Sequence, residues 1–118
     1  MTILQANVAA VLNRTTLSKN DKQRLEQYAQ HTAPGYCAGC ANICEPAVDF
    51  KLPISDILRY SMYQHSYGER DRAQMLFNAL PAAVKAEIPK ADFSIAEQCC
   101  PQSLQIGRIL KETLADLT

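Results

Sequence analysis

Residues 33–53 read APGYCAGCANICEPAVDFKLP, and this stretch divides the sequence into two runs with a helical pattern. Its Gly and Pro residues interrupt regular structure, and three of the chain's five cysteines lie among them, within eight residues. Stable disulfides are not expected in a reducing compartment, and an odd number of cysteines fits a disulfide framework poorly. The stretch therefore predicts a metal or redox site on an irregular loop.

The spacing of these cysteines favours one kind of site. Cys37, Cys40 and Cys44 follow the pattern C-x2-C-x3-C, which lets one loop direct several sulfurs to the same point. Gly39 lacks a Cβ where the backbone must bend, so amide N–H groups can approach sulfur. Three thiolates from a loop and a remote fourth from a Cys-Pro pair are typical ligands of a [4Fe–4S] cluster. We therefore predict one such cluster, with Cys37, Cys40, Cys44 and Cys100 as its ligands.

The fourth ligand could be Cys99 or Cys100, since the two are adjacent. Neighbouring residues point their side chains apart, so both are not expected to ligate one cluster. Pro101 fixes φ and ends the preceding turn, which lets it direct Cys100 away from a helix. We predict that Cys100 is the ligand and that Cys99 is a buried structural thiol. A second cluster is not expected, because five cysteines cannot supply eight ligands.

Helical patterns surround the cysteine loop. Thr2 with Gln5 predicts a capping box, and Ser18 with Asp21 opens a second helix. Apolar spacing predicts helices to about residue 13, through about 31, from about 53–55 to 66, between 68 and 81, and over about 104–117. A weaker pattern covers 82–92, and Ser94 with Glu97 predicts a cap for one turn before Cys99. We predict one small all-α domain of about five to six helices over residues 1–118, with lead-in helices in 1–32 and the cluster-binding part in 33–118.

Composition excludes several classes of protein. Lys plus Arg number 12, as do Asp plus Glu, so the chain has no electrostatic footprint for a nucleic-acid partner. No apolar run approaches the ~20 residues needed to cross a bilayer, and no membrane partner is expected. The N-terminal residues lack the basic start and long apolar stretch of a signal peptide, so we expect a cytoplasmic protein. No catalytic constellation stands out, and no independent catalytic site is expected.

Other readings of the same residues stay open. A structural zinc site with four cysteines usually takes two C-x-x-C pairs, which makes zinc the less favoured metal here. The domain could also be a structural interaction module without metal, or a redox sensor whose cysteines are freed on cluster loss. His31 and His65 are expected to be structural or solvated. Tyr60, Tyr63 and Tyr67 lie near three arginines, Arg59, Arg70 and Arg72. This region indicates the rim of a helix pair, a partner surface or the environment of the cluster.

Three runs of the sequence carry a family resemblance: YCAGCANICEPAV, ISDILRYSMYQHSYGERDRA and AEQCCPQSLQIGRILKE. Together with the opening residues they resemble the C-terminal extension of iron–sulfur-containing relatives of the aldo/keto reductases. In that family a (β/α)8 barrel precedes a small helical segment similar to α-helical ferredoxins. The resemblance implies an α-helical ferredoxin-like fold, a role in electron transfer, and an oxidoreductase barrel as partner, in cis or in trans.

The resemblance also bears on the ligands. Cys37, Cys40 and Cys44 match the first cysteine motif of the extension, and Cys100, within Cys-Pro-Gln-x-Leu-x-Ile, matches the last cysteine of the second. The further cysteines of two-cluster relatives are replaced here by Phe93, Ala96 and their neighbours, so the resemblance implies a single cluster. The catalytic residues of the family belong to the barrel, and none transfers to this chain. We expect either a fragment of a reductase or a small protein that works with one.

Overall fold

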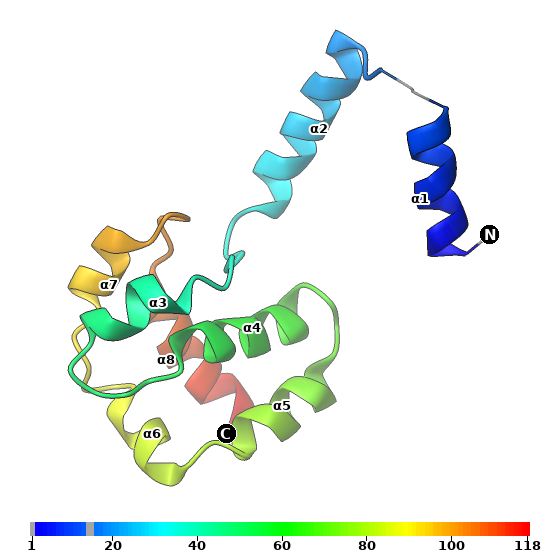
Figure 1. Ribbon diagram of the computed structural model, residues 1–118. Helices are drawn as coiled ribbons and strands as arrows, with labels where there is room; N and C mark the ends of the chain where they lie inside the picture. The colour runs from blue at the N-terminus through cyan, green and yellow to red at the C-terminus, as the bar shows by residue number, and fades with distance from the viewer. Residues whose placement is uncertain (1, 14–15) are drawn as a thin grey trace. The chain divides into compact units, whose positions relative to one another are not determined.

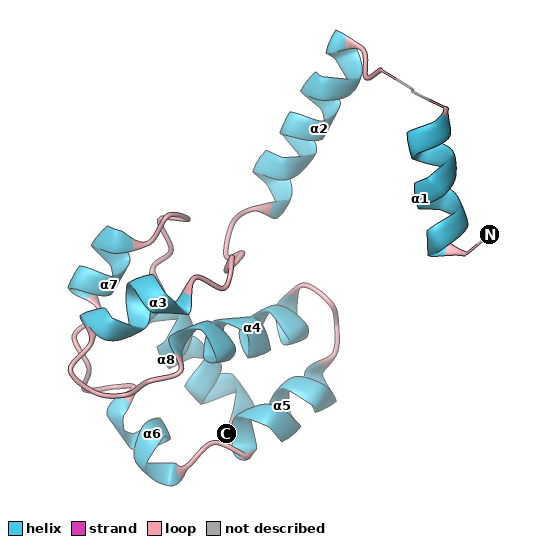
Figure 2. Ribbon diagram, viewed as in Figure 1, coloured by secondary structure: helices cyan, strands magenta, loops and turns pink. Residues whose placement is uncertain are grey.

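A computed structural model of the chain describes residues 2–13 and 16–118, and these residues form helices joined by loops (Figures 1 and 2). No β-strand occurs within the two described ranges, so the prediction of an all-α protein is confirmed. The α-helices are α1 Ile3–Leu12, α2 Lys19–Thr32, α3 Ala41–Cys44, α4 Ile54–His65, α5 Arg70–Asn78, α6 Ala82–Glu87, α7 Ser94–Cys99 and α8 Ile106–Leu117, and a 3₁₀-helix, η1, covers Glu45–Ala47.

The chain divides into two compact units, Met1–Ala33 and Pro34–Thr118. The first contains α1 and α2, and the second contains the other helices together with all five cysteines. The boundary lies at the start of the Gly- and Pro-containing stretch. That the whole of 1–118 acts as one domain stays a prediction.

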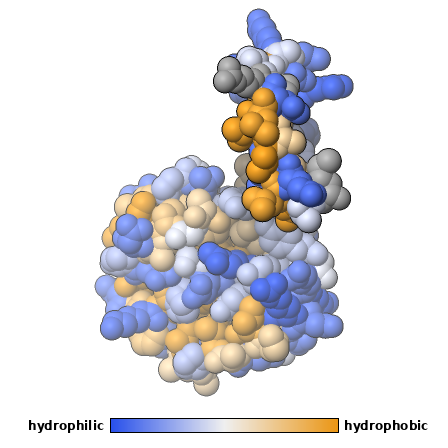
Figure 3. All heavy atoms as spheres, turned by 45° about the vertical axis from the view of Figure 1, so that its right-hand side comes forward, coloured by the Kyte–Doolittle hydropathy of each residue, from blue (hydrophilic) through white to orange (hydrophobic). Residues whose placement is uncertain are grey.

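The first unit has well-capped helices and no core. Thr2 and Gln5 form a reciprocal capping box, and so do Ser18 and Asp21, which confirms both predicted helix starts. None of the residues of α1 or α2 that the structure describes is buried. The apolar side chains of α1 lie on the surface, and Figure 3 shows them as an orange stripe. Local capping, rather than packing, therefore defines these helices.

The second unit is built around α4, α5 and α8. The three helices contact one another, and α7 packs against α3 and α8 (Figure 1). The most amphipathic helix, α8, places Ile106, Leu110 and Leu117 in the core with no exposed surface. The buried side chains that they meet come from α4, α5 and the loops: Leu52, Ile54, Ile57, Leu58, Ala73, Phe77, Ile88, Phe93 and Leu104. The cysteine loop packs against this core.

Two details differ from the sequence-based expectations. The predicted irregular stretch contains α3 and η1, which are too short to show a helical period in the sequence and which raise the number of helices. Ser94 does not cap α7: the cap position is Phe93, and no side chain caps the helix. The side chain of Glu97 instead accepts a hydrogen bond from the backbone N–H of Gly107 at 2.9 Å, because α8 begins beside it.

Within the described ranges, no helix combines the length and the apolar character that crossing a membrane requires.

Candidate metal centre

The first arm of the candidate site is the loop that carries Cys37 and Cys40. Gly39 adopts φ +79°, a left-handed conformation that glycine reaches without strain. Its backbone N–H donates a hydrogen bond to Sγ of Cys37 at 3.4 Å. The predicted role of Gly39 as a bend that brings an amide to sulfur is therefore visible in the geometry of this loop.

Cys44 completes this arm as the last residue of α3. It is 6% exposed and belongs to the hydrophobic core of the second unit. Its Sγ lies 4.0 Å from the backbone oxygen of Cys40, one helical turn earlier. The short helix thus turns the third cysteine back toward the loop and lets its side chain close the inner side of the site.

The second arm is the turn that follows α7. Cys100 leaves the helix with φ −69° and ψ 116°, as expected for a residue before proline, which is disfavoured in the α conformation. The backbone N–H of Ser103 donates to the oxygen of Cys100 at 3.0 Å, which closes the turn around Pro101. Ser103 takes φ +51°, a conformation that costs a non-glycine residue about 1 kcal/mol. Pro101 and this strained turn fix the direction in which Cys100 leaves α7.

The two arms meet on the core. Cys37 and Cys100 are half-buried and pack against the same hydrophobic cluster that contains Cys44. Burial raises the pKa of the Cys37 thiol; the hydrogen bond from Gly39 opposes this, and negative charge on Cys40 and Cys100 adds to it.

The thiol pKa of Cys44 is affected by its surroundings in a similar way. Burial raises its thiol pKa most, and negative charge on Glu45, Cys37 and Cys40 raises it further. Charge on Cys40 and Cys100 therefore acts on Cys37, and charge on Cys37 and Cys40 acts on Cys44.

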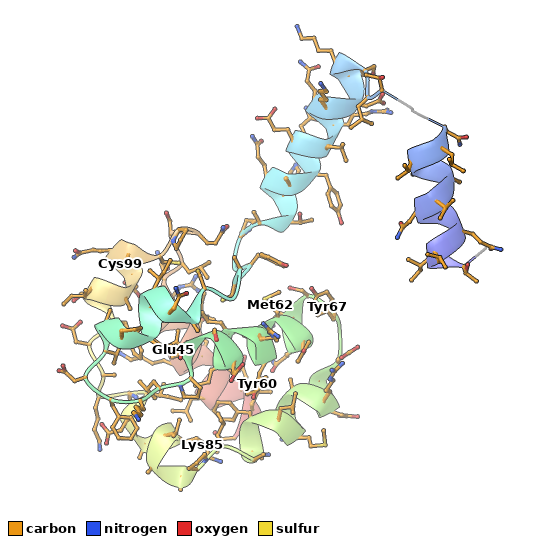
Figure 4. The ribbon with its side chains drawn as sticks, in the orientation of Figure 1. Glu45, Tyr60, Met62, Tyr67, Lys85 and Cys99 are labelled. Atoms are coloured by element: carbon orange, nitrogen blue, oxygen red, sulfur yellow. The ribbon has the colours of Figure 1, made fainter. Side chains whose placement is uncertain are left out.

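Cys99 is not part of this group, and the prediction that it is a buried thiol is wrong. It is exposed at the end of α7, and Figure 4 marks it there. It follows Ile95 by one helical turn, and Ile95 is 57% exposed, so both side chains belong to the solvent face of α7. The buried face of the same helix is occupied by Ala96.

The four cysteines fit an iron–sulfur cluster in the type of ligand that they offer and in the groups that surround them. Cys37, Cys40, Cys44 and Cys100 are soft ligands. Three of them, Cys37, Cys44 and Cys100, lie in or against an apolar core, and a backbone N–H points at the sulfur of Cys37. In the part of the chain that the structure describes, no three Cys, His, Asp or Glu side chains form a group that could hold a single metal ion. The fit therefore rests on the donors and their surroundings rather than on a preformed ion site.

Two charged residues lie beside the cysteines: Arg59, which belongs to the region considered above as a possible cluster environment, and Glu45, which was not predicted. Arg59, on α4, comes close to the loop: a Cβ added at Gly39 would lie 3.5 Å from its Nη2. Glu45 follows Cys44 directly, and its Oε1 accepts hydrogen bonds from the backbone N–H and the hydroxyl of Ser55, both at 3.2 Å. Both contacts join α4 to the cysteine loop across a long stretch of sequence, so no local pattern could reveal them.

The remaining candidates have structural partners. The guanidinium of Arg72 pairs with Glu69 at 2.9 Å and lies over the ring of Tyr63 at 4.6 Å. Tyr63 in turn lies near Tyr67, with ring centroids 6.2 Å apart. This arrangement favours the interpretation of the tyrosine-rich region as the rim of the α4–α5 pair. His65 lies 3.6 Å from Asp116 on α8.

Comparison of the chain with protein-family models, with curated proteins and with solved structures gives no match.

Proposed function

We propose that the chain binds one [4Fe–4S] cluster through Cys37, Cys40, Cys44 and Cys100, and that it serves as an electron-transfer or redox-accessory module. The observation that carries the proposal is that Cys37, Cys44 and Cys100 lie in or against one hydrophobic core, whereas Cys99 is exposed. A bound cluster would supply one-electron chemistry. The chain itself would bind it, orient it and limit its contact with water.

Each part of the protein has a role in this proposal. The Gly39 N–H, which donates to Cys37, would stabilise the thiolate form that a ligand needs. Cys44, as a buried ligand, would shield the inner side of the cluster from solvent. Pro101 and the closed turn at Ser103 would hold Cys100 away from α7 in readiness for ligation. A cytoplasmic location suits this chemistry, because a reducing compartment keeps thiols free of disulfides.

The partner in this proposal is an oxidoreductase of the aldo/keto reductase type, joined in cis or acting in trans. The support is the resemblance of the cysteine motifs and of the α4 and α8 sequences to the iron–sulfur extension of that family. In this setting the second unit would carry electrons to or from the reductase barrel, and the chain would need no catalytic residue of its own.

The test is anaerobic purification and reconstitution with iron and sulfide, followed by elemental analysis and visible absorption. We expect iron and sulfide in the ratio of one [4Fe–4S] cluster per chain, with a broad absorption band from sulfur-to-iron charge transfer. C37S, C40S, C44S and C100S should each lose the cluster or hold it weakly, whereas C99S is the matched control and should load like the wild type. A colourless, iron-free protein would overturn the proposal, and zinc without sulfide would favour a structural zinc module.

A further inference from the structure

The guanidinium of Arg59 lies beside the cysteine loop. It reaches the loop at Gly39, between Cys37 and Cys40, where a Cβ would lie 3.5 Å from Nη2. Within the described ranges, none of the ion pairs involves Arg59. Arg59 therefore places a positive charge beside the cysteine loop, and no carboxylate of the described residues forms an ion pair with it.

Glu45 brings the opposite charge to the other end of the same loop. It follows Cys44 directly in the chain. The two hydrogen bonds from Ser55 hold its carboxylate in place at the start of α4. Glu45 is labelled in Figure 4. A cation and an anion, both tied to α4, therefore flank the cysteines.

We propose that Arg59 is a positioning residue that raises the reduction potential of the cluster and that Glu45 lowers it. This inference rests on the proposed function. A cluster held by four thiolates is anionic, and one-electron reduction adds to its negative charge without making or breaking a covalent bond. A nearby cation stabilises the reduced form more than the oxidised form, and a nearby anion does the reverse.

Solvent limits the shift in reduction potential that each charge can cause. Arg59 is exposed, so water and salt screen its charge, and each shift in potential should become smaller as ionic strength rises. Glu45 is only half-exposed and is screened less. The two shifts should therefore differ in their dependence on salt, in addition to having opposite signs.

The experiment is a potentiometric titration of the full, reconstituted chain with dithionite as reductant and redox mediators, followed by electron paramagnetic resonance. The variants are R59Q, which removes the positive charge, R59K, which keeps it, and E45Q, which removes the negative charge at the same side-chain length. R72Q is the matched control, because Arg72 lies on α5 and pairs with Glu69. We expect R59Q to have a lower midpoint potential than the wild type, E45Q a higher one, and R59K and R72Q one close to the wild type.

The outcomes separate this inference from the proposed function. If the wild type holds no cluster, the proposed function fails and the inference fails with it. If the wild type is loaded and R59Q leaves the midpoint unchanged, the inference alone is wrong. A shift in the same direction for R59Q and E45Q would also overturn it, since that would indicate a structural disturbance. If R59Q does not bind the cluster, E45Q becomes the deciding variant. A midpoint potential of E45Q equal to that of the wild type would then overturn the inference.

Discussion

Glu97 and Gly107 join the two helices that frame the second cysteine arm: the backbone N–H of Gly107 donates to Oε1 of Glu97 at 2.9 Å. Glu97 lies on α7, and the backbone N–H of Cys100 donates to its carbonyl oxygen at 3.2 Å. Gly107 lies in the first turn of α8, where N–H groups lack partners within the helix. One residue therefore holds the start of α8 with its side chain and the end of α7 with its backbone.

The Glu97 side chain should contribute measurably to stability. E97A removes the acceptor and leaves the Gly107 N–H without its partner, and we expect it to lower the free energy of unfolding by about 1 kcal/mol. E97Q keeps an oxygen at the same position and should lose less than half of that. Urea denaturation of the metal-free variants measures both changes. Equal stability of E97A and the wild type would contradict this role.

Gly107 should not tolerate a Cβ. Alanine usually improves a helix by about 1 kcal/mol over glycine. Here its Cβ would lie 3.0 Å from Cδ2 of Phe93, a ring that is only 5% exposed. Overpacking of this kind costs about 1–3 kcal/mol, so we expect G107A to be less stable by about 1 kcal/mol in thermal denaturation.

The double variant F93L G107A provides the control. Leucine removes the ring atom that the new Cβ would meet, so the two changes should destabilise by less than the sum of their separate effects. Strict additivity would show that the Phe93 contact is not the cause.

Local features of the fold were predictable, since their causes lie within one turn of helix. The capping boxes at Thr2 and Ser18 depend on residues three positions apart, and both were predicted. The apolar stripe of α8 fixes which face meets the core. Short helices carry no such signal: a period of 3.6 residues cannot be recognised over the four residues of α3.

For the candidate site, the sequence predicts the four ligands but not the residues that surround them. The pattern C-x2-C-x3-C and the Cys-Pro pair predict four ligands, and of these the structure places Cys37, Cys44 and Cys100 in or against one hydrophobic core. The exposure of Cys99 depends on which face of the six-residue α7 meets the core, and Ala96 and Ile95 are both apolar. The approach of Arg59 to Gly39 depends on how α4 packs, and no local pattern encodes that.

Ser103 should respond to substitution in a way that reveals strain in the Cys100 turn. At φ +51° a β-branched residue is strained further, whereas glycine is not. We expect S103V to lower the free energy of unfolding by about 1–2 kcal/mol and S103G to leave it unchanged or raise it by about 0.5 kcal/mol. Urea denaturation of the metal-free protein checks both. S103V as stable as the wild type would be inconsistent with a strained turn.

Thiol reactivity should rank the cysteines of the metal-free protein. Alkylation requires the thiolate, and iodoacetamide should modify Cys99 first because it is exposed. Cys37 and Cys44 should react slowly at neutral pH, since burial raises the pKa of both thiols above the usual 9.0. Mass spectrometry of the digested protein measures each rate. Modification of Cys44 as fast as Cys99 would contradict the burial of that thiol.

The same pKa shifts predict a loss of stability at alkaline pH. The folded state holds these two protons more tightly than the unfolded state, so the stabilisation is complete below the unfolded pKa. It should decline as pH rises past 9.0 toward the raised folded values. In C37S, which lacks one of these ionisable groups, the decline in unfolding free energy should be smaller.

Removal of residues 1–33 should leave the second unit folded. No described residue of α1 or α2 is buried, and α1 has ten residues, fewer than an isolated helix needs to be stable in water. We expect the 34–118 protein to differ from the full chain by less than about 0.5 kcal/mol in unfolding free energy and to take up the same amount of iron and sulfide. L117A in the full chain is the contrasting variant: Leu117 has no exposed surface, and its truncation should cost about 2–4 kcal/mol. If the shortened protein instead unfolds as readily as L117A, α1 and α2 contribute contacts to the second unit. In that case the division at Ala33 does not describe the folding unit.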